Sequence, residues 1–393
     1  MTPARLLSAL LALLALAGAA QAAGFKAMLL VPADDPRLTR SQVERAYLGH
    51  PGGPASDGLG VALDESKLEL DAAGTSLEVE TVAIADAAAA RSAALRADKA
   101  GMLALLADLP IDQLLAVADA TALPVLNLGD AADRLREADC RPHLLHLLPS
   151  ERMRADALAQ TLVGRKWRDV LLLTGPSPAD AERSATARAA ITRYGLRVVA
   201  AKPFKLSADP RERELANPLL LTAATGVTGG SYDVVWVVDS AGEFARSLPY
   251  RSALPRPVVG DAGLLALAWA PGFDRLGAPQ GARRFAKAAK RAMTAHDWAA
   301  WLAGKALATA AVAKPKGPVS AVRQALVDGE LDGSKGVLMG FRPWDGQLRQ
   351  PVLLADGQGV IGMAPIDGIL HPKNSLDTLG ADEPEKRCKV SRR

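Results

Sequence analysis

The chain has 393 residues, of which 49% are hydrophobic, and a formal net charge of +4 at pH 7. This length exceeds a typical single domain, so we expect two lobes once any targeting segment is removed. Only 4% of the residues are aromatic and the body of the chain has no basic block, which argues against a nucleic-acid-binding protein.

Residues 1–23 have the pattern of a secretory signal peptide. Arg5 gives a positive end, residues 6–17 form an apolar stretch too short to span a membrane, and Ala20-Gln21-Ala22 is a small-x-small cleavage site. The first cysteine is Cys140, far from this stretch, which argues against a lipid-anchored protein. We therefore expect a free protein of the periplasm.

The polar loop that follows the first expected strand, 25–31, supplies the first candidate ligand contacts. Asp34, Asp35 and Arg37 lie in this loop, although a solvated connection is the alternative interpretation. A helix through residue 47 is expected next. Hydrophobic periodicity then predicts helices over 59–72, 86–99 and 111–122, and strands over 77–84, 102–107 and 124–128.

Two further polar turns, at 108–110 and 127–130, end successive strands of this half. The carboxyl ends of parallel strands meet at one edge of a sheet, so both turns should lie at the same edge. The apolar segment 142–149 is interpreted as a strand between the lobes. His143 and His146 lie three apart on it and would point to opposite faces, which argues against a metal pair.

The stretch 168–204 predicts a strand, a helix and a second strand. Val170 to Leu173 is uninterrupted and apolar, Ser177 stands at the expected helix N-cap, and Gly195 ends the helix. This unit implies an open α/β sheet with a ligand crevice beyond the carboxyl ends of its strands. The turn 174–178 lacks the glycines of a dinucleotide site and the lysine of a P-loop, so no cofactor is expected.

The remaining half is predicted to continue the alternation. Helices are expected over 151–167, 215–224 and 294–313, with strands over 233–238 and 257–259 that end near Asp239 and Asp261. Two strands around the turn 342–346 read as a hairpin, and the polar tail after residue 376 is expected to be loosely held.

Two cysteines, Cys140 and Cys388, are too far apart in sequence for a metal knuckle or a redox C-x-x-C motif. A disulfide and two isolated thiols remain alternatives, because sequence separation does not determine geometry. The chain also lacks a G-x-S-x-G elbow, an H-E-x-x-H motif and an EF-hand loop. A binding protein is therefore favoured over an enzyme.

Several stretches resemble a known family. The segments LLHLLPSERMRADALA, DVVWVVDSAGEF and PRPVVGDAGL look like the periplasmic substrate-binding proteins of ABC transporters, of the branched-chain amino-acid type. The segments DPRERELANPLLLT, FRPWDGQLRQP and LDTLGADEPE look more closely like the subgroup of the PQQ-dependent alcohol dehydrogenase system.

The resemblance implies a type I periplasmic-binding-protein fold, an α/β fold of two doubly wound lobes with three crossovers and an interlobe cleft. The first lobe would be 24–147 plus 263–331, the second 148–262 plus 332–376, with 377–393 as a polar tail. It implies a monomeric solute receptor that feeds a membrane permease. A periplasmic sensor or accessory protein that keeps the fold without transport is the alternative.

The resemblance also marks the candidate ligand-binding residues. The turn at Asp108 stands where relatives have a Gly-Pro-x-Ser-Ser loop, and 127–130 stands where they hold a ligand carboxylate. Acidic Asp108 and Asp130 would repel a carboxylate and suit a hydroxyl group or a cation, whereas Asp261 matches an acidic residue that binds the ligand's amino group. The candidates are Asp35, Asp108, Leu109, Asn127, Asp130, Ser177, Asp239 and Asp261.

Overall fold

A computed structural model describes residues 23–39, 48–223 and 231–390. The expected signal peptide lies outside the described residues except for Ala23, which begins the first strand. The helix expected through residue 47 also lies outside them.

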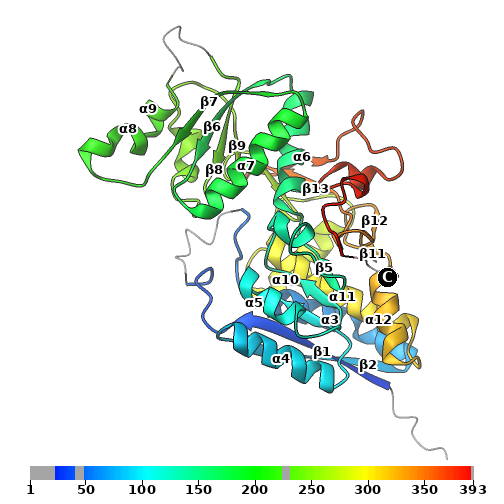
Figure 1. The fold of residues 1–393 in the computed structure, drawn as a ribbon. Helices are drawn as coiled ribbons and strands as arrows, with labels where there is room; N and C mark the ends of the chain where they lie inside the picture. Colours follow the sequence, from blue (N-terminus) through cyan, green and yellow to red (C-terminus); the bar gives the residue numbers. More distant parts are fainter. Residues whose placement is uncertain (1–22, 40–47, 224–230, 391–393) are drawn as a thin grey trace, which may run out of the picture.

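The first lobe, as we name it here, is built on a five-stranded parallel sheet (Figure 1). Its strands are β1 (Ala23–Pro32), β2 (Thr75–Ile84), β3 (Leu105–Ala107), β4 (Val125–Asn127) and β5 (Leu144–His146), in the order β2-β1-β3-β4-β5. Helices α3 (Ala55–Ala73) and α11 (Ala295–Ala313) pack on one face, and α4 (Ala87–Lys99) and α5 (Ile111–Ala118) pack on the other. Burial on both faces explains why β3 is apolar throughout and why β4 is apolar except for its last residue, Asn127.

The second lobe is built on a four-stranded parallel sheet in the order β7-β6-β8-β9. The strands are β6 (Asp169–Thr174), β7 (Arg197–Pro203), β8 (Val234–Val238) and β9 (Val258–Gly260). Helices α6 (Glu151–Gly164) and α7 (Pro178–Arg193) cover one face, and the stacked rings of Phe204 and Phe244 pack on the other. Each sheet has its first strand second in order, so each has a ligand crevice next to that strand.

A small antiparallel sheet joins the lobes. It contains β10 (Leu265–Leu267), β13 (Val352–Ala355) and β14 (Val360–Ala364), with β13 in the middle. Successive side chains of a strand point to opposite faces. Leu265 and Leu267 accordingly enter the core of the first lobe, and Ala266 enters the core of the second. One strand therefore packs against both lobes.

The helix starts follow the sequence signals. Ser177 caps α7 and Thr294 caps α11, each in a capping box with an aspartate three residues later. Shorter elements complete the fold: α8 (Arg213–Ala216), α9 (Pro218–Leu221), α10 (Ala278–Ala289), α12 (Val319–Asp328), β11 (Leu331–Asp332), β12 (Leu338–Met339), and the 3₁₀ turns Asp133–Arg136, Pro210–Glu212, Ala245–Tyr250, Ser375–Thr378 and Glu383–Glu385. The helix expected over 215–224 is thus replaced by two one-turn helices, because Pro218 cannot continue a helix from the preceding turn.

The hairpin expected around 342–346 is confirmed, but it is short. An antiparallel bridge joins Phe341 to Leu348, and the N–H of Arg342 donates to the carbonyl of Gln347 across the turn. The strands on either side do not extend this hairpin, because β12 pairs with β11 and β13 pairs with β10 and β14. The turn also makes polar contacts. Arg342 and Gln347 are buried there and bond to segments far away in sequence.

The C-terminal tail is not loosely held. Arg342 donates from Nε to Oδ1 of Asp377 at 2.8 Å, and both residues are at most 5% exposed. Glu385 accepts two hydrogen bonds from Arg152 at the start of α6. The sequence did not predict these contacts, because the tail is polar and the residues that it contacts are distant in sequence.

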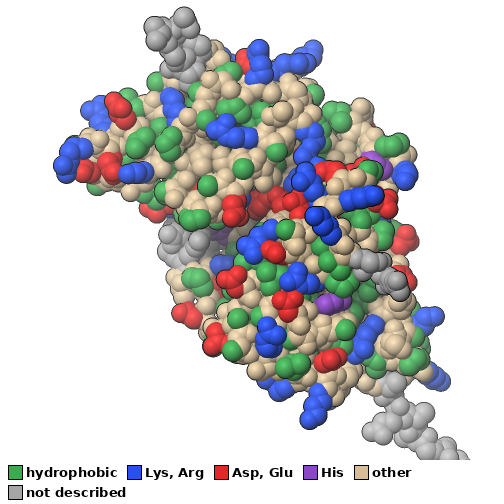
Figure 2. Space-filling view, in the orientation of Figure 1, with side chains coloured by type: hydrophobic (Ala, Val, Ile, Leu, Met, Phe, Trp, Pro, Cys, Tyr) green, Lys and Arg blue, Asp and Glu red, His purple; other side chains and the backbone are tan. Residues whose placement is uncertain are grey.

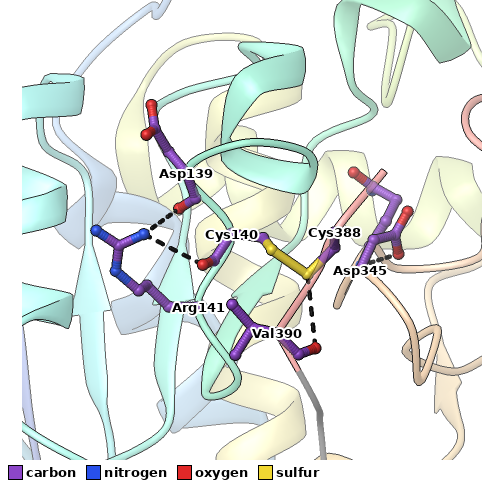
Figure 3. Close-up of a disulfide and its surroundings, with 7 residues drawn as sticks. Asp139, Cys140, Arg141, Asp345, Cys388 and Val390 are labelled. Atoms are coloured by element: carbon purple, nitrogen blue, oxygen red, sulfur yellow. Dashed lines mark hydrogen bonds between the residues drawn. A yellow bond between two sulfur atoms is a disulfide. The ribbon is translucent and has the colours of Figure 1, made fainter. Parts of the chain in front are cut away.

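Cys140 and Cys388 form a disulfide with a Cα–Cα distance of 5.7 Å, so the structure has the paired alternative (Figure 3). Arg141 donates to the carbonyl oxygens of Asp139 and Cys140, which holds the backbone beside the disulfide. Arg152 belongs to α6 of the second lobe, whereas Cys140 precedes β5 of the first. The tail is therefore fastened to both lobes.

Candidate functional site

A cavity of about 600 Å³ lies between the lobes, at the carboxyl edges of their sheets. Figure 2 shows acidic side chains gathered along the boundary between the two lobes. The charged and histidine side chains that line the cavity are His50, Asp130, Asp133, Arg134, Glu151, Arg154, Glu182, Arg183, Asp239, Asp261 and His296. The first lobe contributes the segment 129–134 and the start of α11, and the second contributes α7 and the loops after β8 and β9.

Arg183, on α7, connects two carboxylates of the cavity wall. Its Nη2 donates to Oδ1 of Asp261 at 2.6 Å, and its Nε lies 3.1 Å from Oε2 of Glu151. Burial alone would lower the pKa of Arg183, but the two carboxylates outweigh burial and raise it. The second oxygen of Asp261 accepts the backbone N–H of Asp239 at 2.6 Å. Asp261, expected to hold a ligand amine, is thus already bound by a cation of the protein.

The other two arginines of the cavity are paired as well. Arg154 donates from Nη1 to Oε1 of Glu151 at 3.0 Å and from Nε to the carbonyl of Ala266. Arg134 pairs with Asp139 at 2.5 Å. Burial would raise the pKa of Glu151, but Arg154 and Arg183 hold it below its usual range. Every arginine that lines the cavity has a carboxylate partner.

Four carboxylates of the cavity have no such partner. Among the residues that the structure describes, Asp130, Asp133, Glu182 and Asp239 form no salt bridge with lysine or arginine. Burial raises the pKa of Asp130, Asp133 and Asp239. Asp133 accepts from the hydroxyl of Thr186 on α7, a hydrogen bond of 3.1 Å that spans the two lobes.

His296, the second residue of α11, presents an imidazole to the cavity. Its Nδ1 is buried and has no hydrogen-bond partner among the described residues. Burial, together with nearby Arg37, lowers the pKa of His296 to about 3. The ring is therefore neutral at pH 7 and adds no positive charge to the cavity.

Three of the predicted ligand residues, Asp130, Asp239 and Asp261, line the cavity. Asp35 and Asp108 do not line the cavity, because both are bound by Arg37. Its guanidinium donates to Asp35 and forms two hydrogen bonds with Asp108, at 2.9 and 3.0 Å. The loop residue that sequence reasoning named beside Asp35 is thus the cation that occupies the acidic turn after β3.

The three other candidates have structural roles. Leu109 is buried in the core against α5. Asn127 accepts from the N–H groups of Gly129 and Asp130 and donates to the carbonyl of Asp130, which shapes the turn 127–130. Ser177 caps α7. These residues support the cavity wall and do not line the cavity.

Sequence reasoning missed Glu151, Glu182 and Arg183. All three lie within the first two turns of helices that begin at the crevice edge. The signal that could have found them is their distance of one to six residues from an N-cap serine that follows a strand end. The predictions considered the ends of the strands and not the N-terminal turns of the helices that follow them.

The described residues contain no group of three or more His, Cys, Asp or Glu side chains arranged to hold a metal ion. His143 bonds to the carbonyl of Ala118, whereas His146 bonds to the amide of Asn127, so the two rings have separate partners. In the same part of the chain, no helix has the length and apolar character needed to span a membrane.

Solved structures share this architecture over most of its length. A periplasmic binding protein from Burkholderia mallei superposes with a TM-score of 0.65 over 93% of this chain and 98% of its own, at 15% identity. The chain has the type I periplasmic-binding-protein fold. A branched-chain amino-acid ABC transporter periplasmic ligand-binding protein from Burkholderia xenovorans shares it, with a TM-score of 0.68 over 86% of this chain and 95% of its own, at 14% identity.

A third structure with this binding-protein fold is an ABC transporter solute-binding protein from R. palustris in complex with benzoate. It gives a TM-score of 0.63 over 86% of this chain and 96% of its own, at 15% identity. No protein-family model matches the chain, and no curated protein matches it in sequence.

Proposed function

We propose that this protein is a periplasmic solute receptor of an ABC import system that encloses a small polar molecule between its lobes. The observation that carries the proposal is the cavity of about 600 Å³ between the carboxyl edges of two parallel sheets. Such edges are where open α/β sheets bind ligands, and this volume is typical of small-molecule sites. Structural neighbours are named solute-binding or ligand-binding proteins of ABC transporters, and one of them contains benzoate.

In this proposal the lobes are 24–147 plus 263–331 and 148–262 plus 332–376. The small sheet joins them, with β10 from the first lobe and β13 and β14 from the second. Bending at the connections beside this sheet opens and closes the cleft, and ligand stabilises the closed state because it touches both walls only there. The chain makes or breaks no bond in its ligand, and a membrane permease receives the closed receptor.

We further propose that the receptor serves PQQ-dependent alcohol oxidation. This finer assignment depends on the sequence resemblance of three stretches, 209–222, 341–351 and 376–385. Two of them pack on each other through Arg342 and Asp377, and Trp344 donates to the carbonyl of Ala381 at 3.2 Å. The two stretches that resemble the subgroup therefore form one structural unit, next to α6.

A sensor or accessory protein without a ligand is the second candidate. The observation that favours it is the saturation of Asp261 by Arg183 and by the backbone of Asp239. A receptor must either displace Arg183 or bind its ligand with other carboxylates.

A thermal-shift screen distinguishes the two functions. It should contain alcohols, aldehydes, short acids, amino acids, amines and pyrroloquinoline quinone. A compound that binds only the folded protein raises the melting temperature in proportion to the logarithm of its concentration. A receptor should respond to one chemical class, and an accessory protein with an empty cleft should respond to none.

A further inference from the structure

The distribution of charge in the cleft identifies a class of ligand, provided that the protein is a solute receptor. The wall contains six carboxylates and three arginines. All three arginines have carboxylate partners within the protein, through Asp139, Glu151 and Asp261. An anionic ligand that approached any of these guanidinium groups would also meet the carboxylate that already neutralises it, and displacing that carboxylate would deprive it of its partner.

A cation would meet the opposite situation. Asp130 on the first lobe and Glu182 on the second form no salt bridge with lysine or arginine among the described residues, although the charge of Arg134 acts on both. Oδ1 of Asp130 accepts the N–H of Ala132, and within the described part of the chain no donor bonds to its second carboxylate oxygen, which remains available. Glu182 is exposed within the cleft. Two open carboxylates thus face the cavity from different lobes.

Other groups of the wall strengthen the preference for positive charge. Asp133 and Asp239 add two more carboxylates that form no salt bridge among the described residues, although their oxygens already accept hydrogen bonds. His296 is neutral at pH 7 and lines the cavity, so it adds no positive charge that would repel an ammonium group. Ammonium groups carry only donors, so they match a wall made of acceptors.

The shape of the acidic wall argues for an organic cation over a metal ion. A divalent ion needs several carboxylate oxygens at about 2.0–2.6 Å from one point. The described residues contain no such grouping, because the carboxylates are spread over 129–134, α7 and the strand ends of the second lobe. Carboxylates on separate walls fit a molecule with donors at separated positions.

We propose that the interlobe cleft binds an organic ammonium ion without a carboxylate group, held by Asp130 from the first lobe and Glu182 from the second. The Arg183 bridge to Glu151 and Asp261 stays in place and forms the floor of the site. This ligand class differs from the benzoate carried by the R. palustris protein.

The test uses four-carbon compounds that differ mainly in charge. Calorimetric titrations of the full protein at pH 7.5 would compare 1,4-diaminobutane, butane-1,4-diol and succinate, with L-leucine and calcium chloride as further probes. We expect the diamine to bind most tightly. Asp130→Asn and Glu182→Gln should each weaken its binding by at least about tenfold, because each removes a charge-assisted contact.

Both substitutions should leave the protein folded. The amide oxygen of Asn can still accept from Ala132, and Glu182 has no hydrogen bond to lose among those of the described residues. Asp98→Asn on α4 and Glu214→Gln on α8 are matched controls, because both residues are exposed and lie outside the cavity. These controls should bind the diamine like the parent protein.

Tighter binding of succinate, leucine or calcium, or equal binding of the diol, would overturn the ammonium proposal and leave the receptor function standing. Binding of the diamine that persists in both cleft variants would overturn the site. Failure of all five probes would also overturn the ammonium class. The wider thermal-shift screen then decides separately whether the protein is a receptor at all.

Discussion

Arg183 donates a hydrogen bond of 2.6 Å from Nη2 to Oδ1 of Asp261, inside the cleft between the lobes. Asp261→Ala should therefore destabilise the protein even without ligand, because the partly buried guanidinium would keep only Glu151. We expect a loss of about 2 kcal/mol in the free energy of unfolding, measured by urea denaturation. Asp274→Ala, at an exposed carboxylate, is the control and should change stability little. Equal stability of the two variants would show that the pair does not hold the cleft wall.

His296 should make stability depend on pH. Its pKa is lowered to about 3 in the folded protein, below the ordinary value of 6.5, by burial and by Arg37, with His50 and Arg154 acting in the same direction and Asp297 opposing. The unfolded chain therefore binds a proton at a pH where the folded protein does not, so this contribution to stability is lost as pH falls from about 6.5 toward 3. His296→Gln cannot titrate, and its denaturation midpoint should fall less than that of the parent between pH 7 and pH 4.5. An identical fall in both proteins would contradict the assignment.

Asp377 joins two buried or partly buried arginines, Arg342 and Arg349. Asp377→Ala would leave Arg342, only 1% exposed, without its main carboxylate partner. We expect a loss of about 3–5 kcal/mol in the free energy of unfolding, measured by chemical denaturation. Asp367→Ala, in a turn of the same C-terminal region, is the comparison. A loss below about 1 kcal/mol for Asp377→Ala would mean that the tail is held mainly by the disulfide.

The disulfide between Cys140 and Cys388 should stabilise the fold by limiting the unfolded chain. It closes a loop with a sequence separation of 248 residues, and loops of this size favour a contribution of about 2–5 kcal/mol. The double variant Cys140→Ser with Cys388→Ser should lower the thermal midpoint. Dithiothreitol should lower the midpoint of the parent protein toward that value and leave the double variant unchanged. A similar response of both proteins to the reductant would argue against the disulfide as its cause.

Ligand affinity should decrease on acidification if ammonium binding depends on Asp130. Burial raises the pKa of this carboxyl group, and a protonated Asp130 no longer attracts a cation. Titrations of 1,4-diaminobutane at pH 7.5, 6 and 5 should show progressively weaker binding. Asp130→Asn should flatten this dependence, because its amide does not titrate. A steep dependence that survives in the variant would point to another carboxylate.

The fold was predictable because the strongest signals are local. The apolar run 170–173, the cap at Ser177 and the periodic helix 294–313 all appear in the structure within a few residues of the expected bounds. The hairpin around 342–346 is shorter than expected because its flanking strands pair with other strands, and the buried Arg342 interacts with Asp377, a contact between segments that periodicity does not relate. Local sequence patterns predict the helices and strands. They do not predict buried polar contacts between segments that are distant in sequence.

The site was predictable only in outline for a similar reason. Strand ends located Asp130, Asp239 and Asp261 at the cavity, but they could not show that Arg37 would occupy Asp108 or that Arg183 would occupy Asp261. Such pairings depend on the reach of long side chains from other elements. The composition of the turns predicted that the cavity wall would be acidic. Only the structure shows which of its carboxylates form no salt bridge.

Filling the cleft tests the central claim most directly. Ala179 is exposed on α7 and lines the cavity, so Ala179→Trp would place an indole in the ligand space with little cost to folding. Ala185→Trp, at an exposed position of α7 outside the cavity, is the matched control. Calorimetric titration with the strongest compound of the screen should show binding lost in Ala179→Trp and retained in Ala185→Trp. Undiminished binding by Ala179→Trp would contradict capture of a solute between the lobes.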